Sequence, residues 1–140
     1  MTGEFFHSID AKGRLIFPAK LKEELGESFY VTKGLDHCLF VYSLEAWKAF
    51  EDKIKALPIS KSRDLQRFFF SGACLCTCDG QGRILLPQTL RDYAELTKEI
   101  CTIGVSERAE IWNADRWQAY NTAMQNDSEK IAEAMEELGF

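Results

Sequence analysis

The sequence contains one motif twice, and this internal repeat constrains the fold more than any other feature. The segment DAKGRLIFP at residues 10–18 recurs as DGQGRILLP at residues 79–87, a shift of 69. Two further matches follow at a shift of 70: Thr32-Lys33-Gly34 with Thr102-Ile103-Gly104, and the Trp-containing segments 41–50 and 111–120. A long period with only two copies indicates a duplicated domain, because solenoid units are about 20 to 50 residues long.

Each copy has the same predicted order of elements: a strand, a tight turn, a strand, a short helix, two strands and a longer helix. Pro18 and Pro87 each mark the start of a short helix, since the first helical position has no use for an N–H. Gly26 suits the end of the first short helix. Ser43 and Asn113 are predicted N-caps of the two longer helices.

These elements predict a mainly β fold with helices, of the α+β class, built from two pseudo-symmetric copies. The predicted parts are a first copy at residues 5–57, a linker at 58–72, a second copy at 73–120 and an acidic helical tail at 121–140. Within the linker we expect a connection over residues 58–62 and a helical segment from Arg63 to Arg67. In the tail, apolar residues at helical spacing predict a short amphipathic helix whose apolar face packs on a neighbour. These residues are Ile131, Ala134, Met135 and Leu138.

Composition agrees with a soluble, folded protein, since 46% of the residues are hydrophobic and 28% are charged. No run of residues approaches the roughly 18 uninterrupted apolar residues of a membrane helix. The first residues lack the basic-then-apolar order of a signal peptide, so we expect a cytoplasmic protein. In that reducing compartment the five cysteines are expected to be free thiols.

The net charge of −5 argues at first against a nucleic-acid partner, because phosphate binding depends on Lys and Arg. The charges are unevenly distributed, however. Between residues 10 and 22 a single acidic residue, Asp10, stands against four basic ones: Lys12, Arg14, Lys20 and Lys22. Residues 121–140 hold five acidic residues and one basic residue. The region of the first motif is therefore the candidate for binding an anionic partner.

The first motif predicts a hairpin tip. Asp10 and Gly13 are the first and fourth residues of a turn, where a type I turn closed by a glycine bulge favours them. Lys12 lies in the turn and Arg14 follows it, so two cationic side chains extend from a stiff backbone. Such a tip can enter a major groove, where Arg binds a guanine edge through two hydrogen bonds. For one copy alone, an ordinary turn beside a solvated charge is the simpler interpretation. The recurrence of Asp, Gly, Arg and Pro indicates a constraint, of folding or of binding.

These motifs resemble those of the MraZ family, whose tandem domains are similar to the AbrB-type swapped-hairpin β-barrel and carry an Asp-x-x-x-Arg signature in each copy. The resemblance covers nearly the whole chain. It rests on Gly3-Glu4, both motifs, the run RFFFSGA at residues 67–73, and both Trp-containing helices. It implies a duplicated swapped-hairpin barrel. It also implies a DNA-binding regulator that acts near the start of the division and cell-wall gene cluster, commonly on its own promoter, with subunits assembled into rings.

The resemblance implies roles for individual residues. Lys12 and Arg14 become the leading DNA contacts, with Arg83 as the equivalent of Arg14, and we add Gln81 and Lys20 to these candidates. The residues expected to shape the turns are Asp10, Gly13, Asp79 and Gly82. Because Gln81 stands where the first loop has Lys12, we expect the second loop to bind DNA more weakly. A ring would offset this by presenting many loops to repeated promoter sites.

The expected partners are therefore double-stranded DNA and further copies of the chain, in the cytoplasm and associated with the nucleoid. We expect no cofactor, no metal, no membrane contact and no small-molecule substrate.

Three other functions have less support in the sequence. The spacing of Cys74, Cys76 and Cys78 does not fit a zinc knuckle, so we expect these thiols to pack in the core. No dinucleotide fingerprint, nucleophile elbow or phosphate loop indicates an enzyme, and His7 is expected to be a satisfied residue of the barrel. A protein-binding module of the antitoxin type remains the alternative. Antitoxins, however, usually combine one AbrB-like domain with a disordered tail.

Overall fold

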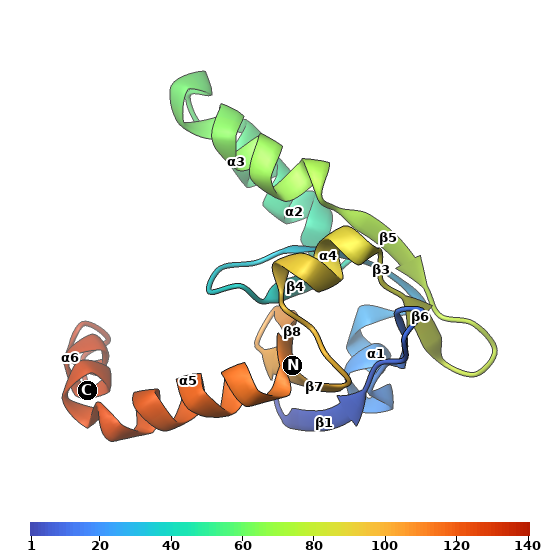
Figure 1. Cartoon of the computed structure of the whole chain (residues 1–140). Coiled ribbons are helices and arrows are strands. Elements are labelled where there is room, and N and C mark those ends of the chain that lie inside the picture. The colour runs from blue at the N-terminus through green and yellow to red at the C-terminus, as the bar shows by residue number, and fades with distance from the viewer.

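The computed structural model describes all 140 residues and has the predicted α+β architecture (Figure 1). The strands are β1 (Glu4–Ser8), β2 (Arg14–Ile16), β3 (Ser28–Lys33), β4 (Leu39–Ser43), β5 (Cys74–Thr77), β6 (Arg83–Leu85), β7 (Glu99–Val105) and β8 (Arg108–Asn113). The helices are α1 (Ala19–Leu25), α2 (Leu44–Lys55), α3 (Ile59–Ser71), α4 (Gln88–Tyr93), α5 (Ala114–Asn126) and α6 (Ser128–Glu136). The α2–α3 hairpin and the α5–α6 arm extend from the central strands in different directions.

The two copies exchange their N-terminal hairpins. Six strands form one antiparallel sheet in the order β1-β7-β8-β4-β3-β5, and β2 pairs with β6 in a separate two-stranded ribbon. Thus β1 of the first copy lies beside β7 of the second, and β5 of the second copy lies beside β3 of the first. At the centre, Leu39 pairs with Ile111 and Val41 with Ala109, so a pseudo-twofold axis passes between β4 and β8.

The predicted swapped-hairpin barrel is not closed. β1 and β5 are the two edges of the sheet and are not hydrogen-bonded to each other. The β2–β6 ribbon covers one face of the sheet. Within the first hairpin, the two chain segments are joined by a single isolated β-bridge, between Ile9 and Leu15. The hairpins fail to complete a barrel because β2 and β6 are only three residues long and pair with each other.

The repeat alignment is also wrong by one residue in β3. Phe5 pairs with Thr102, whereas its equivalent Cys74 pairs with Val31, so Thr102 is the counterpart of Val31 and not of Thr32. Successive residues of a strand point to opposite faces, and the two threonines therefore face different surroundings. The Thr32 hydroxyl donates to the carbonyl of Phe69 in α3, while Thr102 bonds the His7 ring on the other side.

Two apolar clusters cover the two faces of the sheet. The larger lies between the sheet, the β2–β6 ribbon and the short helices α1 and α4, and includes Leu15, Phe17 and Ile84. The smaller is mostly aromatic and lies beneath α2, α3 and α5, where Trp47 and Trp117 are buried. The ribbon is thus held from beneath by the main core.

The predicted helix ends are confirmed with one adjustment. The Ser43 hydroxyl accepts a hydrogen bond from the amide of Ala46 at 3.0 Å, and the Asn113 side chain caps α5 in the same way. Gly26 follows the last residue of α1. Pro18 and Pro87 are the N-cap residues, so α1 and α4 begin one residue later than predicted.

The linker and tail differ from expectation in detail. Residues 59–62 are already helical, because α3 begins directly after Pro58 and packs on α2. In the tail the predicted helix is present as α6, but none of its residues is buried, and Ile131 and Met135 are each 44% exposed. Its apolar face therefore stays largely uncovered by this chain.

Candidate functional site

The first loop is organised around the carboxylate of Asp10. Its Oδ1 accepts hydrogen bonds from the amides of Lys12 at 3.0 Å and Arg14 at 2.8 Å, and its Oδ2 accepts one from Arg14 Nε at 2.8 Å. The amide of Gly13 donates to the Asp10 carbonyl at 3.0 Å, and Gly13 has a φ of 91°. The predicted tight turn with a glycine bulge is therefore confirmed, and Asp10 orients the Arg14 side chain as well as the backbone.

The second loop repeats this geometry almost atom for atom. Asp79 Oδ1 accepts from the amides of Gln81 and Arg83, both at 2.9 Å, and Oδ2 accepts from Arg83 Nε at 2.9 Å. Gly82 has a φ of 76° and its amide donates to the Asp79 carbonyl. In each loop one aspartate thus fixes the arginine two ways, through its amide and its Nε.

These bonds keep the two aspartates ionised. Hydrogen bonds to the carboxylate favour the charged form. The backbone amide of Arg14, aided by its guanidinium, lowers the pKa of Asp10 below the usual value, and Arg83 does the same to the pKa of Asp79. The loops therefore keep their internal ion pairs at neutral pH.

The structure brings Arg14 and Arg83 onto one surface. Arg14 lies opposite Leu85 in the β2–β6 ribbon, and Arg83 lies opposite Ile16. Opposed residues of an antiparallel pair point to the same side, so these four side chains share one face. Ile16 and Leu85 are 63% and 59% exposed there. We call this surface, made by Arg14, Ile16, Arg83 and Leu85, the ribbon face.

Hydrogen bonds between the copies hold both loops to the ribbon. The carbonyl of Gly13 accepts from the amide of Leu86 at 2.9 Å, and the carbonyl of Gly82 accepts from the amide of Phe17 at 3.0 Å. Arg14 and Arg83 are partly exposed, and no residue of the chain binds their terminal nitrogens. Each arginine therefore offers two free donor nitrogens, Nη1 and Nη2, at a fixed position.

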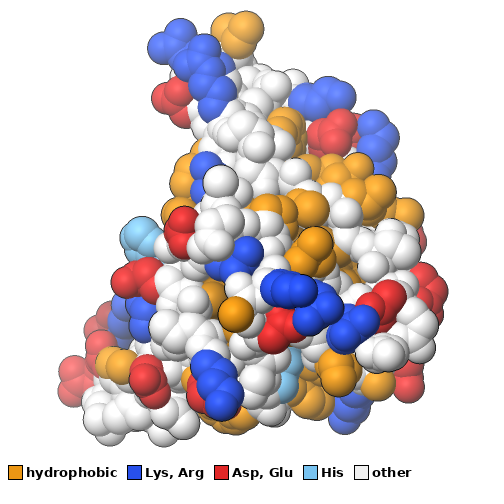
Figure 2. Space-filling model, turned by 45° about the vertical axis from the view of Figure 1, so that its right-hand side comes forward, with side chains coloured by type: hydrophobic (Ala, Val, Ile, Leu, Met, Phe, Trp, Pro, Cys, Tyr) orange, Lys and Arg blue, Asp and Glu red, His pale blue; other side chains and the backbone are white.

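The remaining candidates occupy different places. Lys12 and Gln81 are exposed at equivalent positions in the two loop tips, and Lys20 is exposed in the first turn of α1 without an ion pair. Figure 2, which turns the right-hand side of Figure 1 forward, shows Lys and Arg side chains across the middle of this face, with acidic and apolar side chains between them. The face of the molecule drawn in Figure 2 is thus mixed in charge and not uniformly basic.

Sequence reasoning missed one residue at this site. Arg91 in α4 donates from Nε to the carbonyl of Leu86 at 3.0 Å and from Nη1 to the carbonyl of Ala11 at 3.4 Å. The second contact crosses from the second copy into the first loop. The sequence signal available was only the alignment of Arg91 with Lys22, which does not predict this contact.

The cysteines and His7 lie in or near the core. Cys76 and Cys78 are buried in the larger cluster, and burial raises the pKa of both thiols. No three His, Cys, Asp or Glu side chains are grouped so as to hold a metal ion. His7 Nε2 lies 2.8 Å from the Thr102 hydroxyl, whereas its Nδ1 is buried without a hydrogen-bond partner, so the predicted satisfied histidine is found at only one ring nitrogen. Desolvation lowers its pKa.

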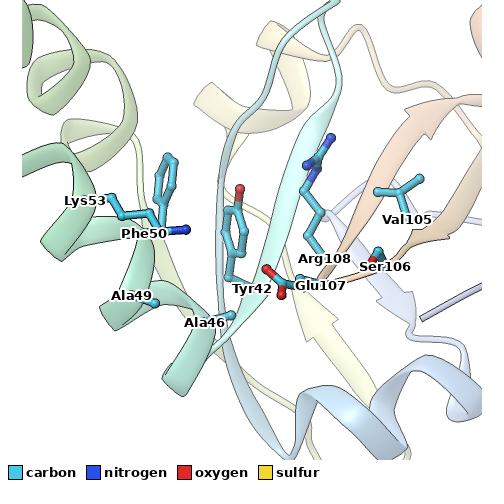
Figure 3. A pocket seen from close by; sticks show the side chains of 9 residues that line it. All are labelled: Tyr42, Ala46, Ala49, Phe50, Lys53, Val105, Ser106, Glu107 and Arg108. Carbon is cyan, nitrogen blue, oxygen red and sulfur yellow. The ribbon is translucent and has the colours of Figure 1, made fainter. Parts of the chain in front are cut away.

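A cleft of about 320 Å³ lies elsewhere, between α2 and the β7–β8 hairpin (Figure 3). Tyr42, Phe50 and Lys53 line one side and Arg108 the other. Arg108 is already engaged, since its guanidinium donates to Glu110 at 2.8 Å and lies 4.3 Å from the centre of the Phe40 ring. Arg108 therefore takes part in packing and does not present a free guanidinium group to the cleft.

None of the six helices combines the length and apolar composition needed to cross a lipid bilayer.

Comparison with known proteins agrees with the internal repeat. A sequence profile of the family described as "MraZ protein, putative antitoxin-like" matches residues 1–68 and again 69–138. A protein of Alkaliphilus metalliredigens named "Transcriptional regulator MraZ" is 53% identical, with 98% of this chain and 97% of that protein aligned. Proteins of the same name from Caldicellulosiruptor saccharolyticus and Clostridium tetani are 52% and 51% identical over 99% and 98% of this chain, and 99% and 97% of their own. These relatives are named as regulators and not as enzymes. The chain belongs to the MraZ family.

Proposed function

We propose that this protein is a transcriptional regulator that binds double-stranded DNA with the ribbon face and the two loops beside it. The observation that carries the proposal is the placement of Arg14 and Arg83 on one exposed face, each fixed by an aspartate and each with free terminal nitrogens. A major groove admits a two-stranded β-ribbon, and an arginine can bind the O6 and N7 atoms of guanine through two donors.

The remaining contacts follow from the same docking. Lys12 and Lys20 supply phosphate contacts, which hold the protein on the duplex without reading sequence. Gln81 replaces the cation in the second loop, so this loop contributes hydrogen bonds and less electrostatic attraction. Ile16 and Leu85 lie between the arginines, where apolar side chains can contact thymine methyl groups.

We extend the proposal to the assembly and the target. Several chains form a homo-oligomeric ring, and each chain contributes its two repeat units, residues 5–57 and 73–120. The ring binds repeated DNA sites with a high effective concentration of loops. The target is the promoter of the division and cell-wall gene cluster, where the protein represses its own operon. The supporting fact is that relatives similar over their whole length are named as transcriptional regulators. The protein then acts in the cytoplasm, on the nucleoid, without a cofactor.

Fluorescence anisotropy tests the proposal with labelled DNA from upstream of the protein's own gene and a scrambled duplex of equal length. Arg14→Ala is expected to lose about 1 to 3 kcal/mol of binding free energy if Arg14 reads one base edge. The matched control is Arg63→Ala, the same change at an exposed arginine on α3, which is expected to bind like the wild type. Affinity should also fall steeply with salt, because bound phosphates release counterions. Equal binding of both duplexes, or no effect of Arg14→Ala, would contradict the proposal.

A second candidate is a protein-binding module of the antitoxin type. The exposed apolar pair Ile16 and Leu85 favours it, since exposed apolar side chains on a sheet suit a protein partner as well as a groove. The two candidates differ in salt dependence and in the effect of Arg14→Ala. Salt-insensitive binding of a protein partner, with no preference for the promoter duplex, would favour the module.

A further inference from the structure

We propose that Arg91 is a positioning residue for the first loop, so that the two loops of one chain differ in stiffness before they meet DNA. The first loop is held in its binding geometry by Arg91, and the second is free to adapt. This inference rests on the proposed DNA-binding function and concerns a residue outside the repeated motif.

Arg91 lies directly over the tip of the first loop. Its side chain is half-buried, and its guanidinium joins the carbonyl of Leu86 to the carbonyl of Ala11, which lies inside the turn. The fit at Gly13 is close: a Cβ built on this glycine would lie 2.7 Å from Arg91 Nε and 2.6 Å from the Leu86 carbonyl. Gly13 is itself buried. The first loop is therefore packed against the body of the second copy.

The second loop lacks such a brace although its own hydrogen bonds are the same. The position equivalent to Arg91 is Lys22, whose Nζ lies 3.2 Å from Glu27 and which forms no hydrogen bond with the second loop. A Cβ built on Gly82 would meet no atom within 4 Å. In Figure 1 the loop between β5 and β6 correspondingly projects beyond the rest of the chain.

The difference matters for binding because ordering a loop costs conformational entropy. A loop that already has its bound geometry avoids much of this cost when the complex forms. Lys12 and Arg14 stand on the braced loop, while Gln81 and Arg83 stand on the unbraced one. The braced loop therefore supplies the more specific contact, and the unbraced loop adjusts to spacing or sequence on the other side of the pseudo-twofold axis.

Hydrogen–deuterium exchange without DNA tests the brace directly. Three equivalent amides are hydrogen-bonded in each loop, those of Lys12, Gly13 and Arg14 and those of Gln81, Gly82 and Arg83. We expect slower exchange in the first set. Arg91→Ala should speed exchange there by about two- to tenfold, the equivalent of one lost hydrogen bond, and leave the second set unchanged. Lys22→Ala is the matched control and should change neither set. Equal exchange in both loops of the wild type would overturn the brace, whether or not DNA binds.

DNA affinity then tests the consequence. Arg91→Ala should weaken promoter binding, and the loss should shrink in an Arg14→Ala background but persist in an Arg83→Ala background, because Arg91 acts through the first loop. Arg91→Lys keeps the charge without the planar fork and should therefore resemble Arg91→Ala. A different outcome would show that Arg91 contacts DNA itself. In that case Arg91→Lys binds like the wild type, and Arg91→Ala only reduces the slope of log affinity against log salt by about one, the effect of one lost phosphate contact. The positioning role would then be wrong. Absence of promoter binding in every variant, with the exchange difference intact, would refute the DNA function and leave the brace standing.

Discussion

Each loop depends on one short side chain that makes three hydrogen bonds. Asp10 and Asp79 bind two backbone amides and one arginine side chain, so the turn and the direction of the arginine are fixed together. This explains why Asp, Gly and Arg recur at identical spacing in copies that otherwise differ. The constraint seen in the sequence is in the first place one of folding, and it also positions the arginine that we propose to bind DNA.

The lowered pKa values predict a loss of loop order in acid. A carboxyl group whose pKa is lower in the folded than in the unfolded protein stabilises the fold at pH values above the unfolded pKa. This stabilisation is lost as the pH falls through the lower, folded pKa. The amides of Gly13 and Gly82 should therefore lose their protection from exchange at pH values below 3.8. Asp10→Asn is the control, and NMR titration is the measurement. In this variant the first loop should show no acid transition, and an unchanged transition there would contradict the role of Asp10.

The two bulge glycines should differ in tolerance to alanine. Both have positive φ, which costs a non-glycine residue roughly 1 to 2 kcal/mol. At Gly82 there is open space, whereas at Gly13 the new methyl group would collide with the Leu86 carbonyl and Arg91. Gly13→Ala should therefore lower the free energy of unfolding by clearly more than Gly82→Ala in urea titrations. Equal losses would show that the first loop relaxes without cost.

At the scale of elements, local signals predicted the helix ends well but did not predict how the strands align. Ser43 and Asn113 cap their helices as predicted, because a cap is a contact between residues three apart. The repeat alignment was wrong by one residue in β3, because the position of this strand is set by its pairing with β4 and β5 and not by its own residues.

The two caps should also differ in their contribution to stability. Ser43→Ala removes one capping bond and is expected to cost about 1 kcal/mol. Asn113→Ala should cost more, because the Asn113 amide also donates to the carbonyl of Glu95 at 2.7 Å. Asn113→Asp keeps the cap without that donor and should fall between alanine and the wild type. Chemical denaturation compares the variants, and a smaller loss for Asn113→Ala than for Ser43→Ala would contradict this account.

At the scale of the whole molecule, the exchange of hairpins makes the copies interdependent. Every strand pair except β3–β4 and β7–β8 joins one copy to the other. The larger core likewise contains residues of both. A single copy therefore leaves strands and core residues without partners.

This predicts that neither copy folds as a monomer. Residues 1–72 and 73–140, produced separately, should each lack near-ultraviolet circular dichroism unless they self-associate, and mixing them should recover the signal of Trp47, Trp112 and Trp117. Light scattering measures the mass of any folded species. A folded monomer of either fragment would contradict the interdependence.

The sequence by itself determined the duplication, the turn chemistry, the helix caps and the α+β class, because these depend on composition and on residues close together in the chain. Resemblance to a family added the hairpin exchange and the roles of Lys12, Arg14 and Arg83 as DNA contacts, and it also implied a barrel that is not closed in this chain. Only the tertiary structure decided which strands pair, that Arg14 and Arg83 share one face, and that Arg91 braces one loop and not the other. These features join residues from the two copies, such as Arg91 and Ala11, which are 80 positions apart, or Glu4 and Ile103, which are paired strand residues. Alternation along a strand shows which side chains face inward, but it does not show which segment lies alongside.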